Sequence, residues 1–281
     1  DSRLIGACLQ EAGAEVRGYN FAPADTTDQV FARIFAKAAG LRYAEYPVPK
    51  GTAYPNWSML LSDALASETG RRRPVRVWHG FDASVTVGYV HMQDPLVPLL
   101  RERRFDAAVD EYIRRRDLGW KGNERVLAPR FSTRMIGNLK NVIWSALCDQ
   151  MPEDPGKAML IFHMEHGAPP LYTSDMEDVD LHCVDWVTPL ADFRLTELML
   201  SVDPVQCVGH AFYMKMLEHL PTIVTSVPWQ TYPGHVPCPL PAPAIPTRWE
   251  RSPEARRFAF RRADGILRGI LRGPLSTDII R

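Results

Sequence analysis

The sequence lacks an excess of charge of either sign, because 33 lysine and arginine residues balance 33 aspartate and glutamate residues. A balanced chain has no overall field that would hold nucleic acid or an anionic membrane at physiological salt. Its short basic runs, such as 71–73 and 101–104, have acidic residues nearby and are interpreted as solvated faces. We therefore expect neither a nucleic acid nor a membrane as partner.

Cysteine is also scarce, and its few positions follow no pattern. The five cysteines are scattered, odd in number and form no CxxC pair, which argues against a disulfide framework. No apolar run approaches the roughly 20 residues that a membrane-spanning helix needs, and the first residues carry no targeting pattern. These absences favour reduced thiols and a cytoplasmic location.

The composition itself is that of an ordinary globular protein. The 281 residues are 46% hydrophobic and 23% charged, which is compatible with one large domain. Within this single domain we distinguish four parts along the chain. They are an α/β part over 1–95, a helical part over 96–227, a proline-rich strap over 228–250 and a terminal helix within 251–281.

The α/β part alternates helix and strand patterns in the order that builds a parallel sheet. The predicted helices span 1–12, 27–39 and 57–67, and the predicted strands span 15–21, 42–48 and 74–78. We expect the three strands to be neighbours in one parallel sheet. A parallel α/β domain normally begins with a strand, whereas this sequence opens on a helix, so we expect either a fragment or the loss of a first strand.

The spacing of apolar residues and the proline content predict the structure of the helical part and of the carboxy-terminal segments. Helices are predicted over 97–118, 132–150, 156–166, 192–201, 208–220 and 253–271. The stretch 228–246 contains too many prolines for regular structure and is interpreted as an extended strap. His163 and His166 have a spacing that could suit a metal, but no third ligand is evident, and ordinary packing of that helix is the favoured interpretation.

Two loops are the expected place for chemistry. In open parallel sheets ligands bind beyond the carboxyl ends of the strands. The loops 21–28 and 79–84 follow the first and third predicted strands, so they should line one crevice. The second loop carries His79, Gly80 and Asp82.

A series of segments resembles the asparagine synthetase family. The opening DSRLIGACLQEAG is similar to the second half of that family's ATP-pyrophosphatase loop, SGGxDS followed by a helix. EVRGYNF, ADTTDQVFARIFAKAAGL and RYAEYPV then follow in the family's order. WHGFDASVTVGY, DWVTPLADFRLTELMLSVDP and YMKMLEHLP resemble its later segments, so the resemblance covers about residues 1–235. It implies a parallel sheet of the PP-loop ATP pyrophosphatase type with a largely helical carboxy-terminal half.

The resemblance also implies an activity. ATP would adenylate a small-molecule carboxylic acid, and ammonia or an amine would then attack the activated acid, releasing AMP and pyrophosphate. ATP and Mg²⁺ are the implied cofactors, and a glutaminase domain is expected upstream in the parent protein. Ser2 would contact phosphate, and Asp1 would help to hold magnesium or the nucleotide.

Further residues are assigned by the same resemblance. Phe21, His79 and Gly80 would line the nucleotide site with Asp1 and Ser2. Asp82 would be a metal ligand and a catalytic carboxylate, and Asp185 would be the second catalytic carboxylate.

The sequence also departs from the family pattern. The acidic loop is one residue shorter, the arginine expected before Pro189 is Val187, and the segment VTSVPWQTYPG lacks the family's lysine and arginine. Losing a preorganised cation at developing phosphate charge commonly costs 10²-fold or more in rate. A catalytically degenerate member that binds a nucleotide or a partner is therefore the alternative.

Overall fold

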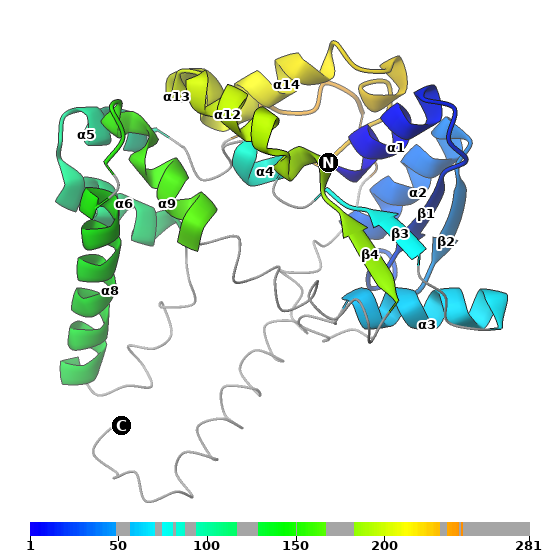
Figure 1. The fold of residues 1–281 in the computed structure, drawn as a ribbon, viewed down its shortest axis with the longest axis horizontal. Helices are drawn as coiled ribbons and strands as arrows, with labels where there is room; N and C mark the ends of the chain where they lie inside the picture. Colours follow the sequence, from blue (N-terminus) through cyan, green and yellow to red (C-terminus); the bar gives the residue numbers. More distant parts are fainter. Residues whose placement is uncertain are drawn as a thin grey trace, which may run out of the picture.

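The computed structural model describes residues 1–48, 57–70, 75–80, 83–87, 94–116, 129–149, 151–166, 183–230, 235–241 and 243. Within these residues the protein is mixed α/β, mostly helical, with two small parallel sheets of two strands each. In Figure 1 the four labelled strands and α1, α2 and α3 lie on the right, and the green helices α5, α6, α8 and α9 lie on the left. No helix in these residues is long and apolar enough to cross a membrane.

The α/β part contains the six elements that the sequence predicts, with shorter strands, a helix over 57–69 that is two residues longer than predicted, and otherwise similar bounds. They are α1 (Ser2–Glu11), β1 (Arg17–Asn20), α2 (Thr27–Ala39), β2 (Arg42–Glu45), α3 (Trp57–Thr69) and β3 (Val75–Trp78). The end of α2 shows why the end of a helix can be predicted from the local sequence. Gly40 adopts the left-handed φ of 64° that glycine accepts without steric cost, and this conformation ends the helix. The amino cap is Thr26, one residue before the predicted Thr27.

The expectation of one sheet containing all three predicted strands is wrong. β1 pairs with β2 in parallel, and β3 pairs in parallel with β4 (Val184–Val187), a strand that the sequence patterns do not predict. Among the described residues no ladder joins β1 to β3. The partner of β3 comes from 109 residues farther along the chain, a separation at which local patterns carry no pairing signal.

Within each pair of the described residues, the two strands run in the same direction. Gln10, near the end of α1, donates a hydrogen bond to the carbonyl of Ala39 at the end of α2 (3.0 Å). β1 and β2 follow these two helices directly, so both strands run back toward the start of α1. β3 ends at the same place, because Gly80 lies against Asp1.

The helical part is built on a single large apolar core. Its fully buried side chains include Leu96, Leu100, Leu147, Met159 and Val224. After the short helix α4 (Ala83–Thr86) of the α/β part, the helices are α5 (Leu96–Arg101), α6 (Phe105–Arg116), α8 (Pro129–Asp149), η1 (Pro155–Lys157), α9 (Ala158–His166), η2 (Pro189–Ala191), α12 (Phe193–Ser201), α13 (Pro204–Cys207), η3 (Val208–His210), α14 (Ala211–Leu217) and η4 (Thr222–Val224).

Two long predicted helices are interrupted. The predicted helix 97–118 is divided into α5 and α6 by a turn in which Arg103 has a φ of 56°. α5 packs on η1 whereas α6 packs on α8, so the two segments follow different axes. The predicted helix 208–220 is likewise divided between η3 and α14, with Gly209 at a φ of 66°. The described residues of the predicted strap contain no helix or strand, and the predicted helix 253–271 lies outside the described residues.

Candidate functional site

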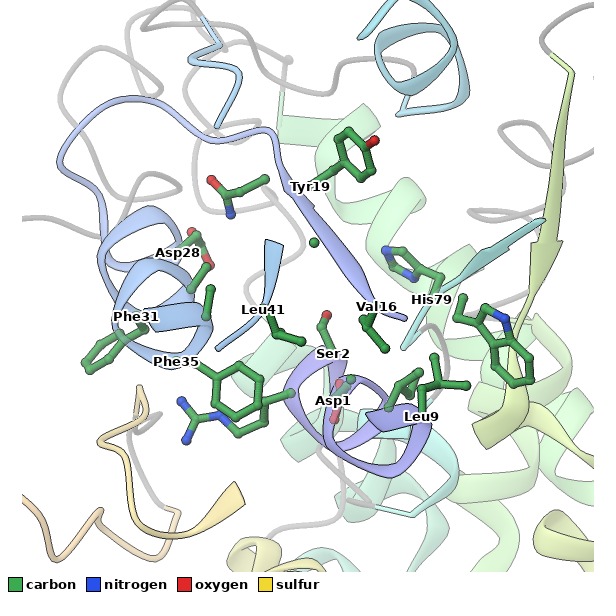
Figure 2. Close-up of a pocket in the computed structure, with 18 of the residues that line it drawn as sticks. Asp1, Ser2, Leu9, Val16, Tyr19, Asp28, Phe31, Phe35, Leu41 and His79 are labelled. Carbon is green, nitrogen blue, oxygen red and sulfur yellow. The ribbon is translucent and has the colours of Figure 1, made fainter. Parts of the chain in front are cut away.

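A cavity of about 1130 Å³ lies between the two strand pairs. β1 borders one side, β3 borders the other, and the start of α1 closes one end. Figure 2 shows Ser2, Val16 and His79 around the same space, although they come from α1, the residue before β1 and the residue after β3. The cavity runs along the whole of β1 and β3, and it includes the residues that follow them, Phe21 and His79, at the strand ends where ligands bind in open parallel sheets.

Four of the sequence-predicted site residues line this cavity together. They are Asp1, Ser2, Phe21 and His79. A fifth, Gly80, forms the close contact between the end of β3 and the start of α1. A Cβ atom added to Gly80 would lie 2.5 Å from the Cβ of Asp1 and 3.2 Å from the backbone nitrogen of Ser2. Only glycine therefore fits where these two elements meet.

Of the two predicted catalytic carboxylates, only Asp185 lies within the described residues, and it does not line the cavity. Asp82 lies outside the described residues. Asp185 is exposed on β4 and accepts a hydrogen bond from Nε of Arg76 on β3 (3.0 Å). Successive side chains of a strand point to opposite faces, so the neighbouring Trp186 lines the cavity and Asp185 does not. The catalytic role predicted for Asp185 therefore finds no support in its position and stays a prediction.

His79 is a neutral polar group in the cavity wall. Burial lowers the pKa of His79 to about 4, so its ring carries no charge near pH 7. The ring lies edge-on to Trp186, with 5.4 Å between the ring centroids. A neutral imidazole can donate or accept a hydrogen bond to a ligand, but it adds no positive charge for a phosphate.

Asp1 is tied to the carboxy-terminal part of the structure. The hydroxyl of Tyr213, on α14, donates a hydrogen bond to Oδ1 of Asp1 (3.0 Å). Burial raises the pKa of Tyr213 to about 12, which keeps the phenol protonated and able to donate. This bond leaves the second carboxylate oxygen of Asp1 for another partner.

Arg3 positions the segment after η4, a role that no sequence signal indicates. Its guanidinium donates hydrogen bonds to the carbonyls of Val224 (3.2 Å), Val227 (2.8 Å) and Pro228 (2.8 Å). It also lies over the rings of Phe35 and Trp229, at 5.2 and 5.9 Å from their centroids. These contacts engage the cation with backbone oxygens, so Arg3 serves the packing of the first turn rather than an anion.

The residues present can contribute to a magnesium site but cannot build one alone. Asp1 is the one member of the predicted metal pair that the structure describes, and the described residues contain no cluster of three potential metal ligands. Mg²⁺ is commonly bound by one or two carboxylates together with phosphate oxygens and water. One free carboxylate oxygen of Asp1 fits that pattern when a phosphate supplies the other ligands.

His163 and His166 behave as ordinary side chains of α9. His163 is buried, with its Nδ1 at 3.3 Å from the hydroxyl of Tyr112, while His166 is exposed beside Glu165. The two rings face different partners, which agrees with the packing interpretation.

No family model matches the sequence, and the comparisons with curated proteins and with solved structures gave no match. The likeness to asparagine synthetases rests on the motifs quoted above.

Proposed function

We propose that this chain binds ATP at the amino end of α1 and activates a substrate carboxylate, as the asparagine synthetase family does. The observation that carries the proposal is the convergence of Asp1, Ser2, Phe21 and His79 on one cavity. The parallel pairing of β1 with β2 and of β3 with β4 agrees with a PP-loop pyrophosphatase type of sheet, which is part of the proposal.

The amino end of α1 supplies the phosphate-binding element. A helix amino end offers unpaired backbone N–H groups and the positive end of the helix dipole, both of which favour an anion. The side chain of Asp1 makes no capping hydrogen bond to these groups, so it does not compete with a phosphate for them. The Asp1 carboxylate would repel a phosphate unless a cation lay between them, and this is consistent with ATP binding as its magnesium complex.

The cavity wall supplies an apolar surface for the adenine. Phe21 follows β1 and stacks on Tyr46, with 5.4 Å between the ring centroids. Such a pair presents a flat apolar surface, which suits a planar base. His79 would add a neutral hydrogen-bonding group on the opposite strand.

The proposed chemistry is carboxylate activation. An oxygen of the substrate acid attacks the α-phosphorus of ATP, and pyrophosphate leaves. Ammonia or an amine then attacks the acyl carbon and displaces AMP. Magnesium, when bound with the triphosphate, supplies positive charge that screens the phosphate oxygens, and Asp1 would be its protein ligand.

A second candidate function, a nucleotide-binding or partner-binding module without turnover, is favoured by a specific observation. Asp185 pairs with Arg76 on an exposed face and does not approach the cavity. Arg3, a cation close to the proposed phosphates, is committed to backbone carbonyls. A site with few free charged groups can bind a nucleotide, but it stabilises a transition state poorly.

Calorimetric titration of the chain with ATP and magnesium tests nucleotide binding. Ser2→Asp places a second negative charge beside the phosphates, while an acid in the first turn of a helix is compatible with helix formation. We expect this variant to weaken ATP binding at least tenfold. Thr222→Asp, an exposed position in η4, is the matched control and should bind as the wild type does. Absence of binding heat for the wild type would refute the proposal.

Pyrophosphate release separates the two candidate functions. The assay uses ATP, ammonia and a panel of carboxylic acids that includes aspartate. Release that depends on one acid supports carboxylate activation. ATP binding without release for any acid supports the module without turnover.

A further inference from the structure

The cavity extends beyond the proposed nucleotide site into a second part, which we call the strap lobe. Its lining comes from α2, from η3 and α14, and from the segment after η4: Phe35, His210, Tyr213, Leu217, Trp229 and His235. The hydrogen bond from Tyr213 to Asp1 (3.0 Å) joins the strap lobe to the start of α1. At about 1130 Å³ the whole cavity exceeds the roughly 300–1,000 Å³ typical of small-molecule sites, so it has room for a second ligand beside a nucleotide.

Aromatic rings make up most of the strap lobe. The rings of His210 and His235 are stacked, with 4.1 Å between their centroids and 26° between their planes. Phe35 and Trp229 are gathered around the guanidinium of Arg3, which lies 5.2 and 5.9 Å from their ring centroids. Rings in a cavity wall favour a flat apolar group, because stacking adds to the free energy of burial.

The backbone of two segments fixes the histidine stack in place. Gly209 and His210 both have a left-handed φ, of 66° and 68°, in the turn before α14. The carbonyl of Gly209 accepts a hydrogen bond from the amide of Val236 (2.9 Å), the residue after His235. This bond ties the segment that carries His235 to the turn that carries His210, so the two rings are held together.

The two histidines of the stack are neutral polar groups. Burial lowers the pKa of His210 to about 4, and burial also lowers the pKa of His235. Nε2 of His210 is buried and has no hydrogen-bond partner among the described residues. A buried polar atom without a partner is costly, so a ligand that brings a neutral hydrogen-bonding group to this nitrogen would gain affinity.

The arginines that line the cavity are already engaged. Among the lining residues that the structure describes, the lysines and arginines are Arg3, Arg17 and Arg76. Arg17 is paired with Glu68 (2.6 Å) and Arg76 with Asp185 (3.0 Å), while Arg3 donates to three backbone carbonyls. A charge that is removed from water without a partner is costly. A ligand with a second carboxylate in the strap lobe is therefore disfavoured.

We propose that the strap lobe binds the ring of an aryl monocarboxylic acid whose ring carries a neutral hydrogen-bonding group, such as a hydroxyl, directed at His210. A hydroxyl can donate to a neutral imidazole or accept from it. The carboxylate of the ligand would lie at the end of the lobe beside Asp1 and Ser2, where the amino end of α1 supplies positive potential. Identification of this acid as the activated substrate rests on the proposed function, whereas its binding does not.

Calorimetric titration without nucleotide tests the binding. The probe is 3-(4-hydroxyphenyl)propanoate, and the comparison acids are 3-phenylpropanoate, succinate and aspartate. Both aryl acids should bind at least about tenfold more tightly than succinate or aspartate, because only they bury a ring. The hydroxyl should add about threefold or more over 3-phenylpropanoate. Absence of binding by the aryl acids would overturn the proposal, and so would equal affinity for aspartate.

A charged substitution at the rim locates the site. Val236 lines the cavity and is 42% exposed, so Val236→Asp should fold and would place a negative charge beside the ligand. It should weaken binding of 3-(4-hydroxyphenyl)propanoate by about fivefold or more. Val205→Asp, on the exposed side of α13 and outside the lining, is the matched control and should bind as the wild type does. Equal binding by both variants would overturn the assignment to the strap lobe.

Pyrophosphate release with ATP and ammonia then tests the role as substrate. The aryl acids should give at least about tenfold higher kcat/KM than aspartate, since the same ring burial acts in the transition state. If the chain binds the aryl acids but no ATP, the proposed function fails and the strap lobe stands. If ATP binds and aspartate supports release better than the aryl acids do, the proposed function stands and the substrate class inferred from the strap lobe is wrong.

Discussion

Replacement of Gly80 by alanine tests whether the start of α1 is locked against the end of β3. The added Cβ would lie 2.5 Å from the Cβ of Asp1 and 3.2 Å from two backbone atoms of Asp1 and Ser2. Carbon atoms in contact prefer a separation of about 3.5–4.0 Å, so the elements would have to separate by roughly 1 Å. The neighbouring atoms belong to the backbone or its first side-chain atom, so rotation of a flexible side chain cannot relieve the clash.

The magnitude follows from the cost of overpacking. Forcing one extra carbon into a tightly packed contact costs about 1–3 kcal/mol. We therefore expect Gly80→Ala to lower the free energy of unfolding by that amount. The start of α1 would also move away from the cavity, so ATP affinity should fall in the calorimetric titration.

Urea unfolding followed by circular dichroism measures the change, with the midpoint and slope reported separately. Gly137→Ala is the matched control, because Gly137 lies inside α8 and no atom is within 4 Å of its added Cβ. Alanine is favoured over glycine within a helix by up to about 1 kcal/mol, so the control should be stabilised. Surface substitutions usually change the free energy of unfolding by less than about 0.5 kcal/mol. If Gly80→Ala changed it by no more than that, the contact between β3 and α1 would not be rigid.

Three further predictions concern the same free energy of unfolding. Arg3→Lys loses the planar guanidinium that donates to several carbonyls at once, so it should lower the free energy of unfolding by about 1–3 kcal/mol. Arg194→Lys, on the exposed side of α12, should leave it unchanged, and equilibrium unfolding in urea measures both. Leu100→Ala, at a position with 0% exposure, should cost about 2–5 kcal/mol, and Leu198→Ala, at 60% exposure, less than about 0.5 kcal/mol in the same experiment. Burial lowers the pKa of His79 to about 4, whereas the unfolded value is near 6.5. Between these two values the unfolded chain binds more protons than the folded protein, so the free energy of unfolding should fall as the pH is lowered from about 6.5 to about 4. Urea titrations at a series of pH values should show a shallower fall for His79→Gln than for the wild type.

The helices of the α/β part could be predicted because their signals are local. In α2, apolar residues at helical spacing are followed by Gly40, and the left-handed conformation of that glycine ends the helix as expected. The division of the predicted helix 97–118 has no such signal. The turn there places Arg103, rather than a glycine, at a positive φ, and it is imposed by the packing of α5 and α6 on different neighbours.

The pairing of the strands could not be predicted because it is decided by long-range contacts. Val184–Val187 is four residues long, and its two valines flank an aspartate and a tryptophan, which is a weak pattern for a strand. Its partner lies 109 residues earlier in the sequence, and nothing in either segment specifies the other. β1 and β3 are equally short, and although the segments that contain them were predicted as strands, their neighbours in the sheet were not.

Part of the candidate site followed from a general rule and part did not. The rule that ligands bind at the carboxyl ends of parallel strands was sufficient to bring Phe21 and His79 to one cavity. The orientation of Asp185 depends on the register of β4, and a shift of one residue moves a side chain to the other face. The role of Arg3 depends on carbonyls more than 220 residues away, which its sequence neighbours do not indicate.

The hydrogen bonds of Arg3 also determine when, during synthesis of the protein, α1 can complete its contacts. The guanidinium on the first turn of α1 finds its acceptors only at Val224, Val227 and Pro228, so α1 cannot complete its contacts until the ribosome has released those residues. At about 5–20 residues per second, this interval is roughly 11–45 s. During that interval the cationic face of α1 is available to chaperones and proteases. A chain that terminates before residue 224 would keep that exposure permanently, which predicts rapid degradation of nascent fragments of this length.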